Sequence, residues 1–361
     1  MFNLDDLQAI GELDSDRMRE RIGELPQQCR QAWARARQLN APPGYGAIDH
    51  LVIVGMGGSA IGGALLQDLI SDHSGVSTTI VRDYALPAFA EGTNSLVIAC
   101  SYSGNTEETL SCFKQAQEAG TRSIAITTGG KLSQMAREDG VPILQFDYPS
   151  QPMAALGYSF ILLLCVVSEA GLARDYTADV AEAAAVMENW QADIRPQTPT
   201  ADNAAKRLAQ EIHGRLPVVY GAGFLAATAN RWKTQFNENA KSWAFFELLP
   251  ELNHNAVVGL DMPGFMQQQA IVVFLRSALD RARIQERWDV THELLARQGV
   301  TSHEVWGRGE SKLAQMLSLI HFGDYVSFYA AMLNEVDPTP VDTIAFLKQR
   351  LAEMGGVVDE S

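Results

Sequence analysis

The stretch LVIVGMGGSAIGGALLQDLI, residues 51–70, decides the class of fold. Its first four residues are an apolar run of strand length, glycines follow at positions 55, 57 and 58, and an apolar helical pattern continues to its end. This order predicts a β-strand, a tight glycine turn and an α-helix. The stretch PVVYGAGFLAATA, residues 217–229, has the same order roughly half a chain later. The chain therefore contains an internal repeat of one strand–turn–helix unit.

Further strand and helix patterns alternate around these two stretches. Short apolar runs that predict strands stand at residues 77–84, 94–100, 122–127, 141–147, 269–277 and 300–309. Longer helical patterns cover residues 1–40, 154–200 and about 311–334, and a last helix carries Lys348. Strands that alternate with helices indicate a mostly parallel sheet covered on both faces. We predict an α/β fold with two domains, each a mostly parallel sheet flanked by helices.

The same patterns divide the chain into four parts. An N-terminal helical segment covers residues 1–40 and ends before APPGYGAIDH, whose prolines and glycines break the helical pattern. The first α/β domain spans residues 41–153, a helical linker spans 154–200, and the second domain with C-terminal helices spans 201–361. A length of 361 residues favours two domains, because one ordinary domain is shorter. One large doubly wound sheet is the alternative, but it would not need the helical middle.

The composition is that of a soluble globular protein, with 47% hydrophobic and 20% charged residues. Its formal net charge of −15 argues against a protein that coats nucleic acid or an anionic membrane. The four cysteines are scattered, without a C-x-x-C pair or a histidine cluster, so we expect neither a metal site nor a disulfide framework. The charged N-terminus lacks the apolar segment of a signal peptide, and we expect a cytoplasmic protein.

Two loops at predicted strand ends carry the residue types of an anion site. Glycines let the backbone approach a ligand, and the free N–H groups at a helix start face an anion. The first loop offers Gly57, Gly58 and Ser59, and the second, SYSGNT at 101–106, offers the hydroxyls of Ser101, Ser103 and Thr106. Open α/β sheets bind ligands at this end of their strands. The pair of loops predicts a phosphomonoester site, with turn and helix-cap roles for the hydroxyls as the alternative.

Two nucleotide-binding motifs fit these loops less well. Gly55, Gly57 and Ala60 match the pattern G-x-G-x-x-G only if alanine is allowed at the third position. That pattern also leaves the hydroxyls of the second loop without a role. No G-K-S or G-K-T follows either loop, so the Walker pattern is absent. The loops therefore suit a small phosphorylated ligand better than a dinucleotide.

The loop SYSGNT after GMGGS resembles the sugar isomerase (SIS) domain, which binds the phosphate of phosphosugars with such a Ser/Thr loop. Two such domains in one chain are similar to the phosphoglucose isomerase superfamily, and more narrowly to its bifunctional phosphoglucose/phosphomannose isomerases. Further motifs extend the resemblance over most of the chain from about residue 50 onward: PMAALGYSF (152–160), WKTQFNENAK (232–241), ELLPELNHNAVVGL (247–260) and GDYVSFYAAMLNEVDPTPVDTIAFLK (323–348).

The resemblance implies an aldose–ketose isomerase that interconverts glucose 6-phosphate, and mannose 6-phosphate, with fructose 6-phosphate. The reaction moves a proton between C1 and C2 through a cis-enediol, and it needs no cofactor and no metal. The resemblance assigns the carbon base to Glu238 in NENAK and ring opening to His254 and Lys348. It also implies a homodimer in which His254 reaches the active site of the neighbouring subunit. Thr339 is a candidate for the substrate pocket.

One position departs from the family pattern. Where the family carries an arginine in Q-P-R-A-A-L-G-Y, this chain has Met153. The resemblance gives that arginine the role of stabilising the enediolate, and a methionine supplies no charge and no strong donor. Three outcomes stay open: a slow isomerase, an isomerase that uses Lys241 or Arg231 instead, or a divergent phosphosugar-binding regulator without catalysis. The presence of both Glu238 and His254 favours the enzyme. An amidotransferase-type sugar isomerase is a weaker alternative, because NENAK and PELNHN do not belong to it.

Overall fold

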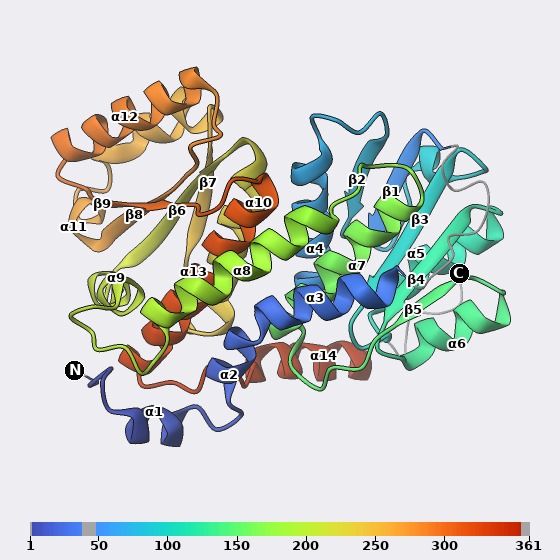
Figure 1. The fold of residues 1–361 in the computed structure, drawn as a ribbon, viewed down its shortest axis with the longest axis horizontal. Coiled ribbons are helices and arrows are strands. Elements are labelled where there is room, and N and C mark those ends of the chain that lie inside the picture. The colour runs from blue at the N-terminus through green and yellow to red at the C-terminus, as the bar shows by residue number, and fades with distance from the viewer. Residues whose placement is uncertain (1, 38–47, 355–361) are drawn as a thin grey trace.

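The computed structural model describes residues 2–37 and 48–354, and it contains two parallel β-sheets on either side of a layer of helices (Figure 1). In the first sheet the strand order is β2-β1-β3-β4-β5, and each neighbouring pair is parallel. Its strands are β1 (His50–Val54), β2 (Ser77–Val81), β3 (Ser95–Ser101), β4 (Arg122–Thr127) and β5 (Ile143–Gln145). The predicted limit between residues 40 and 41 lies outside the described residues.

The second sheet repeats the first in shorter form. Its strand order is β7-β6-β8-β9, and all three neighbouring pairs are parallel. In both sheets the strand before the glycine turn lies between the next two strands of the chain. The prediction of an α/β fold with two mostly parallel, helix-flanked sheets is confirmed. The strands are β6 (Leu216–Ala222), β7 (Phe245–Leu249), β8 (Ala270–Arg276) and β9 (Thr301–Trp306).

Helices cover both faces of the first sheet. Successive side chains of a strand point to opposite faces, so each strand contributes apolar side chains to both layers of helices. Leu51 and Ile53 of β1 belong to the cluster that contains α4 (Gly57–Ile70) and α7 (Leu156–Glu169). Val52 and Val54 pack with α5 (Glu107–Glu118) on the other face. A strand buried on both faces needs apolar residues at every position, which explains the continuous run at 51–54. Helix α6 (Gly130–Glu138) covers β4 on the side of α5.

The helical layer between the sheets belongs to both halves of the molecule. Helices α10 (Ala226–Glu238) and α13 (Lys312–Leu333) cover one face of the second sheet, and α12 (Ala282–Arg297) covers the other. One apolar cluster runs from the first sheet through this layer to the second sheet. Helix α10 also packs against α4. The layer is completed by α3 (Leu25–Ala36), α8 (Thr177–Ile194) and α9 (Ala204–Ile212), and short helices are α1 (Leu7–Leu13), α2 (Met18–Gly23) and α11 (Met266–Gln269).

Helix α13 is the central helix of this layer. It has 22 residues, and its length and apolar composition alone would allow it to cross a membrane. Its most apolar window is, however, 100% buried inside the protein. A helix that is apolar all round is expected in the core of a large protein as well as in a membrane. We therefore assign α13 as a core helix.

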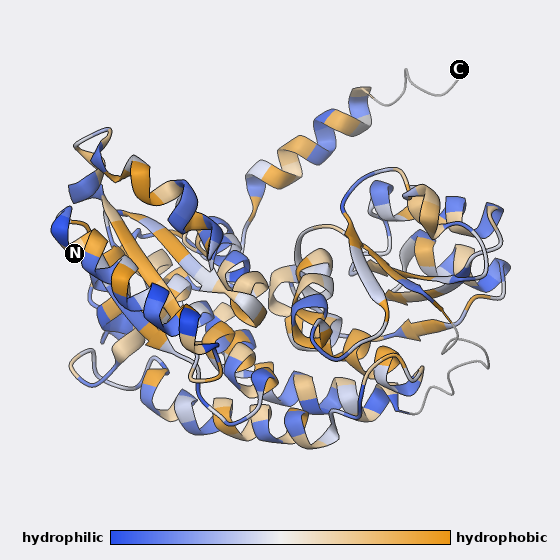
Figure 2. Cartoon of the chain, turned by 90° about the horizontal axis from the view of Figure 1, so that it is seen from above, coloured by the Kyte–Doolittle hydropathy of each residue, from blue (hydrophilic) through white to orange (hydrophobic). Residues whose placement is uncertain are grey.

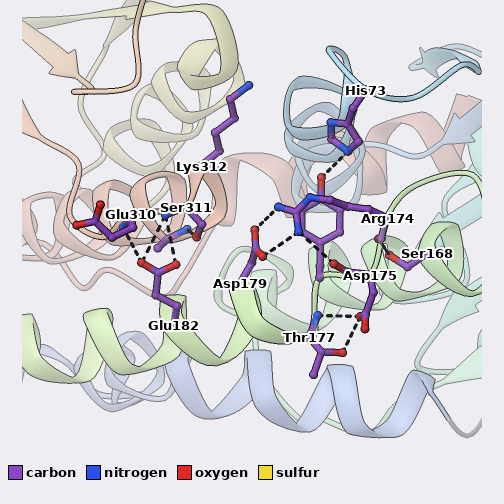
Figure 3. Close-up of polar contacts among 12 residues, drawn as sticks. His73, Ser168, Arg174, Asp175, Thr177, Asp179, Glu182, Glu310, Ser311 and Lys312 are labelled. Carbon is purple, nitrogen blue, oxygen red and sulfur yellow. Dashed lines mark hydrogen bonds and ion pairs between the residues drawn. The ribbon is translucent and has the colours of Figure 1, made fainter.

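Polar contacts fasten the start of α13 to the linker helices and to the first half (Figure 3). Glu182 of α8 accepts hydrogen bonds from the backbone N–H groups of Glu310, at 2.6 Å, and Ser311, at 3.3 Å. A carboxylate is favourable there, because the N–H groups of a first helical turn lack partners within the helix. The first residue of α13, Lys312, forms an ion pair with Asp72, which follows α4. The two halves are thus joined by polar contacts as well as by the apolar layer.

One element was not evident from the sequence pattern, namely strand β7, whereas the predicted last helix that carries Lys348 is present. Strand β7 occupies residues for which no strand is predicted, since Glu247 interrupts its apolar residues and only its last side chain is buried. Helix α14 (Asp342–Met354) extends away from both sheets (Figure 2). Its apolar side chains are open to solvent in the single chain, with Phe346 65% and Leu347 56% exposed.

Candidate active site

The two predicted anion-binding loops leave the first sheet at the same edge. Strands β1 and β3 are parallel neighbours, with Val54 paired to Ala99, so their carboxyl ends meet there. Gly55 makes the close approach possible, because a Cβ at this position would stand 2.9 Å from the Cys100 carbonyl oxygen. The structure thereby brings together the two predicted groups of ligands, namely Gly57, Gly58 and Ser59 in one loop and Ser101, Ser103 and Thr106 in the other. Their binding of phosphate stays a prediction.

The second loop is held in shape by its own hydroxyls. Ser101 Oγ lies 2.9 Å from Thr106 Oγ1 and accepts a hydrogen bond from the Gly104 N–H at 3.1 Å. Ser103 Oγ accepts from the Asn105 N–H at 3.2 Å. Thr106 is also the residue before α5, so its hydroxyl stands at a helix start. The hydroxyls therefore order the turn, and whether they also bind an anion together with the first loop stays a prediction.

A short 3-10 helix at Pro152–Ala154 packs against the start of the first loop's helix. A Cβ on Gly58 would come within 3.0 Å of the Pro152 carbonyl oxygen and 3.6 Å of the Met153 nitrogen. Ser59, one residue further along α4, is only 8% exposed. The segment 152–154 and the two loops together form what we call the cradle: residues 57–59, 101–106 and 152–154.

Glu238 is the last residue of α10, and it lines a cavity of about 650 Å³. The facing wall comes from the turn before α14 and from the first turn of that helix. The walls include Asn237, Lys241, Asp337, Val341 and Ile344. A half-buried carboxylate in a cavity of this size is suited to proton transfer with a small ligand.

Burial raises the pKa of the Glu238 carboxyl above its ordinary value. Positive charges counteract that rise, and they come from Arg231, then Lys241, then Lys233. A carboxylate with a raised pKa is a stronger base, and a base works best when its pKa approaches the working pH. Lys241 also donates a hydrogen bond to the Pro338 carbonyl at 3.1 Å, which ties the end of α10 to the opposite wall. The site thus holds a carboxylate with a raised pKa and lysine and arginine charges that act on it.

His254 and Lys348 stand on elements other than α10, and both are exposed in the single chain. His254 ends the 3-10 helix Glu251–His254 that follows β7, and its side chain is exposed. Lys348 is exposed on α14. Neither residue is among those that line the cavity of Glu238. The structure therefore does not assemble the predicted base and the predicted ring-opening groups in a single described chain.

The two candidate pocket residues are both buried in the protein interior. Met153 is 2% exposed and belongs to the main apolar cluster, and Thr339 is 3% exposed. Neither lines the cavity of Glu238, although Asp337 and Pro340 on either side of Thr339 do. In the single chain neither side chain faces that cavity, and their place in the substrate pocket stays a prediction. Both positions are enclosed because neighbouring elements pack over them, which the local sequence pattern does not reveal.

Three acidic residues near the site were not predicted. Asp337 and Asp342 line the cavity, and Asp324 is paired with Arg231 in the core. A lone aspartate in the apolar helical pattern of residues 312–333 was the signal that could have identified Asp324. Within residues 2–37 and 48–354, no group of three or more His, Cys, Asp or Glu side chains could hold a metal ion.

Known proteins similar to this chain identify its family. The model of the bacterial phospho-glucose isomerase C-terminal SIS domain matches residues 201–351, a range that includes Glu238, His254 and Lys348. A bifunctional phosphoglucose/phosphomannose isomerase of Caldicellulosiruptor bescii is 42% identical over 340 residues, which cover 93% of this chain and 99% of the relative. The chain belongs to the bifunctional phosphoglucose/phosphomannose isomerase family. The family inferred from the glycine and hydroxyl loops is thereby confirmed.

Two further similarities agree with membership of this isomerase family. A relative of the same name from Aquifex aeolicus is 36% identical over 302 residues, covering 83% of this chain and 90% of the relative. A solved structure from Thermus thermophilus, described as a hypothetical protein, superposes with a TM-score of 0.73. It covers 96% of this chain and 94% of its own at 16% identity, so it supports the fold alone.

Proposed function

We propose that this protein is an aldose–ketose isomerase that interconverts glucose 6-phosphate and mannose 6-phosphate with fructose 6-phosphate. The observation that carries the proposal is the half-buried Glu238 carboxylate at the cavity. Burial raises the pKa of this carboxyl, and the chain belongs to an isomerase family. A regulator that only binds phosphosugars has no need of such a base. The cradle would hold the phosphate of the sugar through its N–H groups and hydroxyls.

The proposed proton transfer needs only one base. Glu238 would remove the C2 proton of the open-chain aldose, and the electron pair of that C–H bond would form the C1=C2 bond of the enediol while O1 gains a proton. Return of the proton to C1, with loss of the O2 proton, gives the ketose. Glucose 6-phosphate and mannose 6-phosphate differ only at C2, so both give the same enediol. Protonation of this enediol at C2 from opposite faces gives the two epimers, so one base serves both substrates when rotation about the C2–C3 bond presents either face to it. His254 and Lys348 are proposed to open the sugar ring.

We also propose a homodimer in which His254 acts in the site of the partner. The side chains around the His254 segment support this, because large apolar groups there are exposed in the single chain. Trp243 and Met262 are each 80% exposed, Val258 is 78% exposed and Phe265 is 65% exposed. Exposed apolar surface of this extent is typical of an interface. Light scattering should give twice the chain mass, and a fully active species of single-chain mass would contradict the dimer.

The test of the proposed reaction is Glu238→Gln, assayed with fructose 6-phosphate and a coupled reporter of glucose 6-phosphate. The amide keeps the size of the side chain but cannot accept the C2 proton. We expect a loss of about 10²–10⁴-fold in kcat, the usual contribution of a general base. Affinity for inorganic phosphate should persist, because the cradle is intact.

Glu247→Gln is the matched control, because this glutamate is exposed on β7 and lies outside the cavity lining. It should keep the activity of the wild type. Substantial turnover by Glu238→Gln would show that another group is the base. A wild-type protein that binds phosphate but turns over neither sugar would instead support the non-catalytic regulator, which the arginine-to-methionine departure at position 153 favours.

A further inference from the structure

Arg231 is a buried cation between the two parts of the candidate site. It lies on α10, about two helical turns before Glu238, and it is 2% exposed. Residues two turns apart share one face of a helix and are separated by roughly 10 Å along its axis. Arg231 Nη2 donates a hydrogen bond to the Met153 carbonyl oxygen at 2.7 Å and lies 3.1 Å from Asp324 Oδ2. Its head group therefore joins α10 to the segment 152–154 and to α13.

The segment that Arg231 holds is part of the cradle. The Pro152 carbonyl approaches Gly58 so closely that a Cβ there would stand 3.0 Å away. A separate contact links α10 directly to α4, since the Ala227 N–H of α10 donates to the Asp68 carboxylate of α4 at 2.6 Å. Helix α10 is thus attached at its first turn to the helix of the cradle, and through Arg231 to the segment that covers the cradle. Its other end carries Glu238.

The contacts of Arg231 are not those of an optimised buried ion pair. Its Nε–H is buried and has no hydrogen-bond partner among the described residues. Asp324 is itself 5% exposed, and burial raises the pKa of its carboxyl against the charge of Arg231. Buried ion pairs add little net stability relative to apolar side chains of similar size. The cost of burying this charge therefore points to a role in positioning the elements that Arg231 joins, as well as in stability.

We propose that Arg231 is a positioning residue that fixes the Glu238 carboxylate relative to the cradle. With the sugar phosphate held in the cradle, the guanidinium keeps α10 at the distance and angle that place the base at C1 and C2. Both contacts, to the Met153 carbonyl and to the Asp324 carboxylate, are made by Nη2 at the far end of the long arginine side chain. The inference rests on the isomerase function proposed above.

The test compares Arg231→Lys with a matched control, Arg276→Lys. Arg276 is also a buried arginine, 4% exposed, with ion pairs to Glu304 and Asp289 and an unpartnered Nε–H. It lies on β8, outside the cradle and the cavity lining. Each variant is measured for its urea unfolding midpoint, for its affinity for inorganic phosphate, and for kcat and KM with fructose 6-phosphate.

Lysine keeps the charge at position 231, but its shorter side chain ends before the position of Nη2, which makes both contacts. We expect kcat to fall about 100-fold, the loss that a misplacement of about 1 Å can cause, while phosphate affinity stays within about threefold. Arg276→Lys should lower the urea unfolding midpoint about as much as Arg231→Lys does, and it should keep kcat within about twofold of the wild type. Wild-type kcat in a folded Arg231→Lys protein, or an equal loss of kcat in both variants, would overturn the inference.

The pH dependence of kcat tests the inference independently of stability. A purely structural role of Arg231 would leave the pH of the acid limb unchanged. The charges facing Glu238 are Arg231 and Lys233 on α10 and Lys241 after it, and Asp337 and Asp342 line the opposite wall. Arg231→Gln removes one positive charge and should move the acid limb of kcat to higher pH, whereas Arg231→Lys should leave it in place. Equal profiles in the two variants would contradict a placement of Arg231 beside the base.

Two outcomes keep this inference separate from the proposed function. If the wild type has no isomerase activity, the proposed reaction and the role of Arg231 both fall. If the wild type is active and the Arg231 variants are too, only the role of Arg231 falls. Should Arg231→Lys not fold, the double variant Arg231→Met with Asp324→Leu removes both charges and should fold. Loss of kcat with retained phosphate affinity is expected there as well, and wild-type kcat would overturn the inference.

Discussion

At the scale of single residues, position 153 shows how burial changes the meaning of a substitution. The sequence alone suggests that Met153→Arg would restore a cation to the site. In the structure the methionine side chain is packed in the core, and its backbone oxygen already accepts a hydrogen bond from Arg231. A second guanidinium there would be buried beside the first without an additional acid to pair with it. Arg231, and not residue 153, is therefore the cation that contacts the cradle segment from the helix that carries the base.

We expect Met153→Arg to lower the free energy of unfolding by at least about 2 kcal/mol, because it adds volume and an unpaired charge to a packed interior. It should not raise kcat. Urea unfolding and the coupled assay measure both effects. Met153→Leu is the control, since a swap that conserves volume costs less than about 1.5 kcal/mol. A stable Met153→Arg protein with higher turnover would show that this side chain does reach the substrate.

At the scale of elements, the SYSGNT loop depends on one glycine. Gly104 has a φ of +67°, and a Cβ at this position would stand 1.8 Å from the Gly129 carbonyl oxygen. The Gly104 N–H also donates to Ser101 Oγ, so a shift of this residue would move the hydroxyls of the cradle. The turn after β3 is thus locked against the turn after β4. This packing explains why the loop can be rigid although it lies at the edge of the sheet.

Gly104→Ala should therefore disturb both stability and phosphate binding. We expect a loss of at least about 2 kcal/mol in unfolding free energy, from the left-handed backbone and the clash together. Affinity for inorganic phosphate, measured by calorimetry, should fall at least about tenfold. Gly120→Ala is the control, because Gly120 has a φ of +66° but open space around it. The control should show only the backbone strain, and similar phosphate affinity in both variants would refute a role for the loop.

At the scale of the whole molecule, acid stability should depend on a histidine in the central layer. His321 on α13 is 1% exposed, and one ring nitrogen bonds the Ile22 carbonyl of α2 at 3.1 Å. Burial lowers the pKa of His321 from 6.5 to about 4. A histidine whose pKa is depressed in the folded state stabilises the fold above pH 6.5 and loses that contribution as the pH falls toward about 4.

The expected size of this effect is about 3 kcal/mol between pH 7 and pH 4. His321→Gln keeps a donor but does not titrate, so its unfolding free energy should fall less steeply over this interval. Urea unfolding at a series of pH values measures the slope. His292→Gln, at an exposed position, should retain the slope of the wild type. Parallel slopes for all three proteins would show that His321 does not control acid stability.

The sequence by itself determined the class of fold and the composition of the cradle. The glycine turns after residues 54 and 222 and the alternation of strands with helices are local patterns, and each unit folds from contiguous residues. Parallel sheets collect the carboxyl ends of their strands at one edge, so the pairing of the loops at 57–59 and 101–106 followed from their positions in the pattern. Strand β7 was not predicted, because Glu247 interrupts its apolar residues and most of its side chains are not buried.

Only the tertiary structure decided how the base, the cations and the core are arranged. The contacts of Arg231 join it to residues 78 and 93 positions away, and no local pattern specifies such pairs. The same holds for the raised pKa of Glu238, which results from burial by elements far apart in the chain. Burial of Met153 and Thr339 likewise depends on what packs over them. Residue types are a property of the sequence, whereas distances and desolvation exist only once the chain has folded.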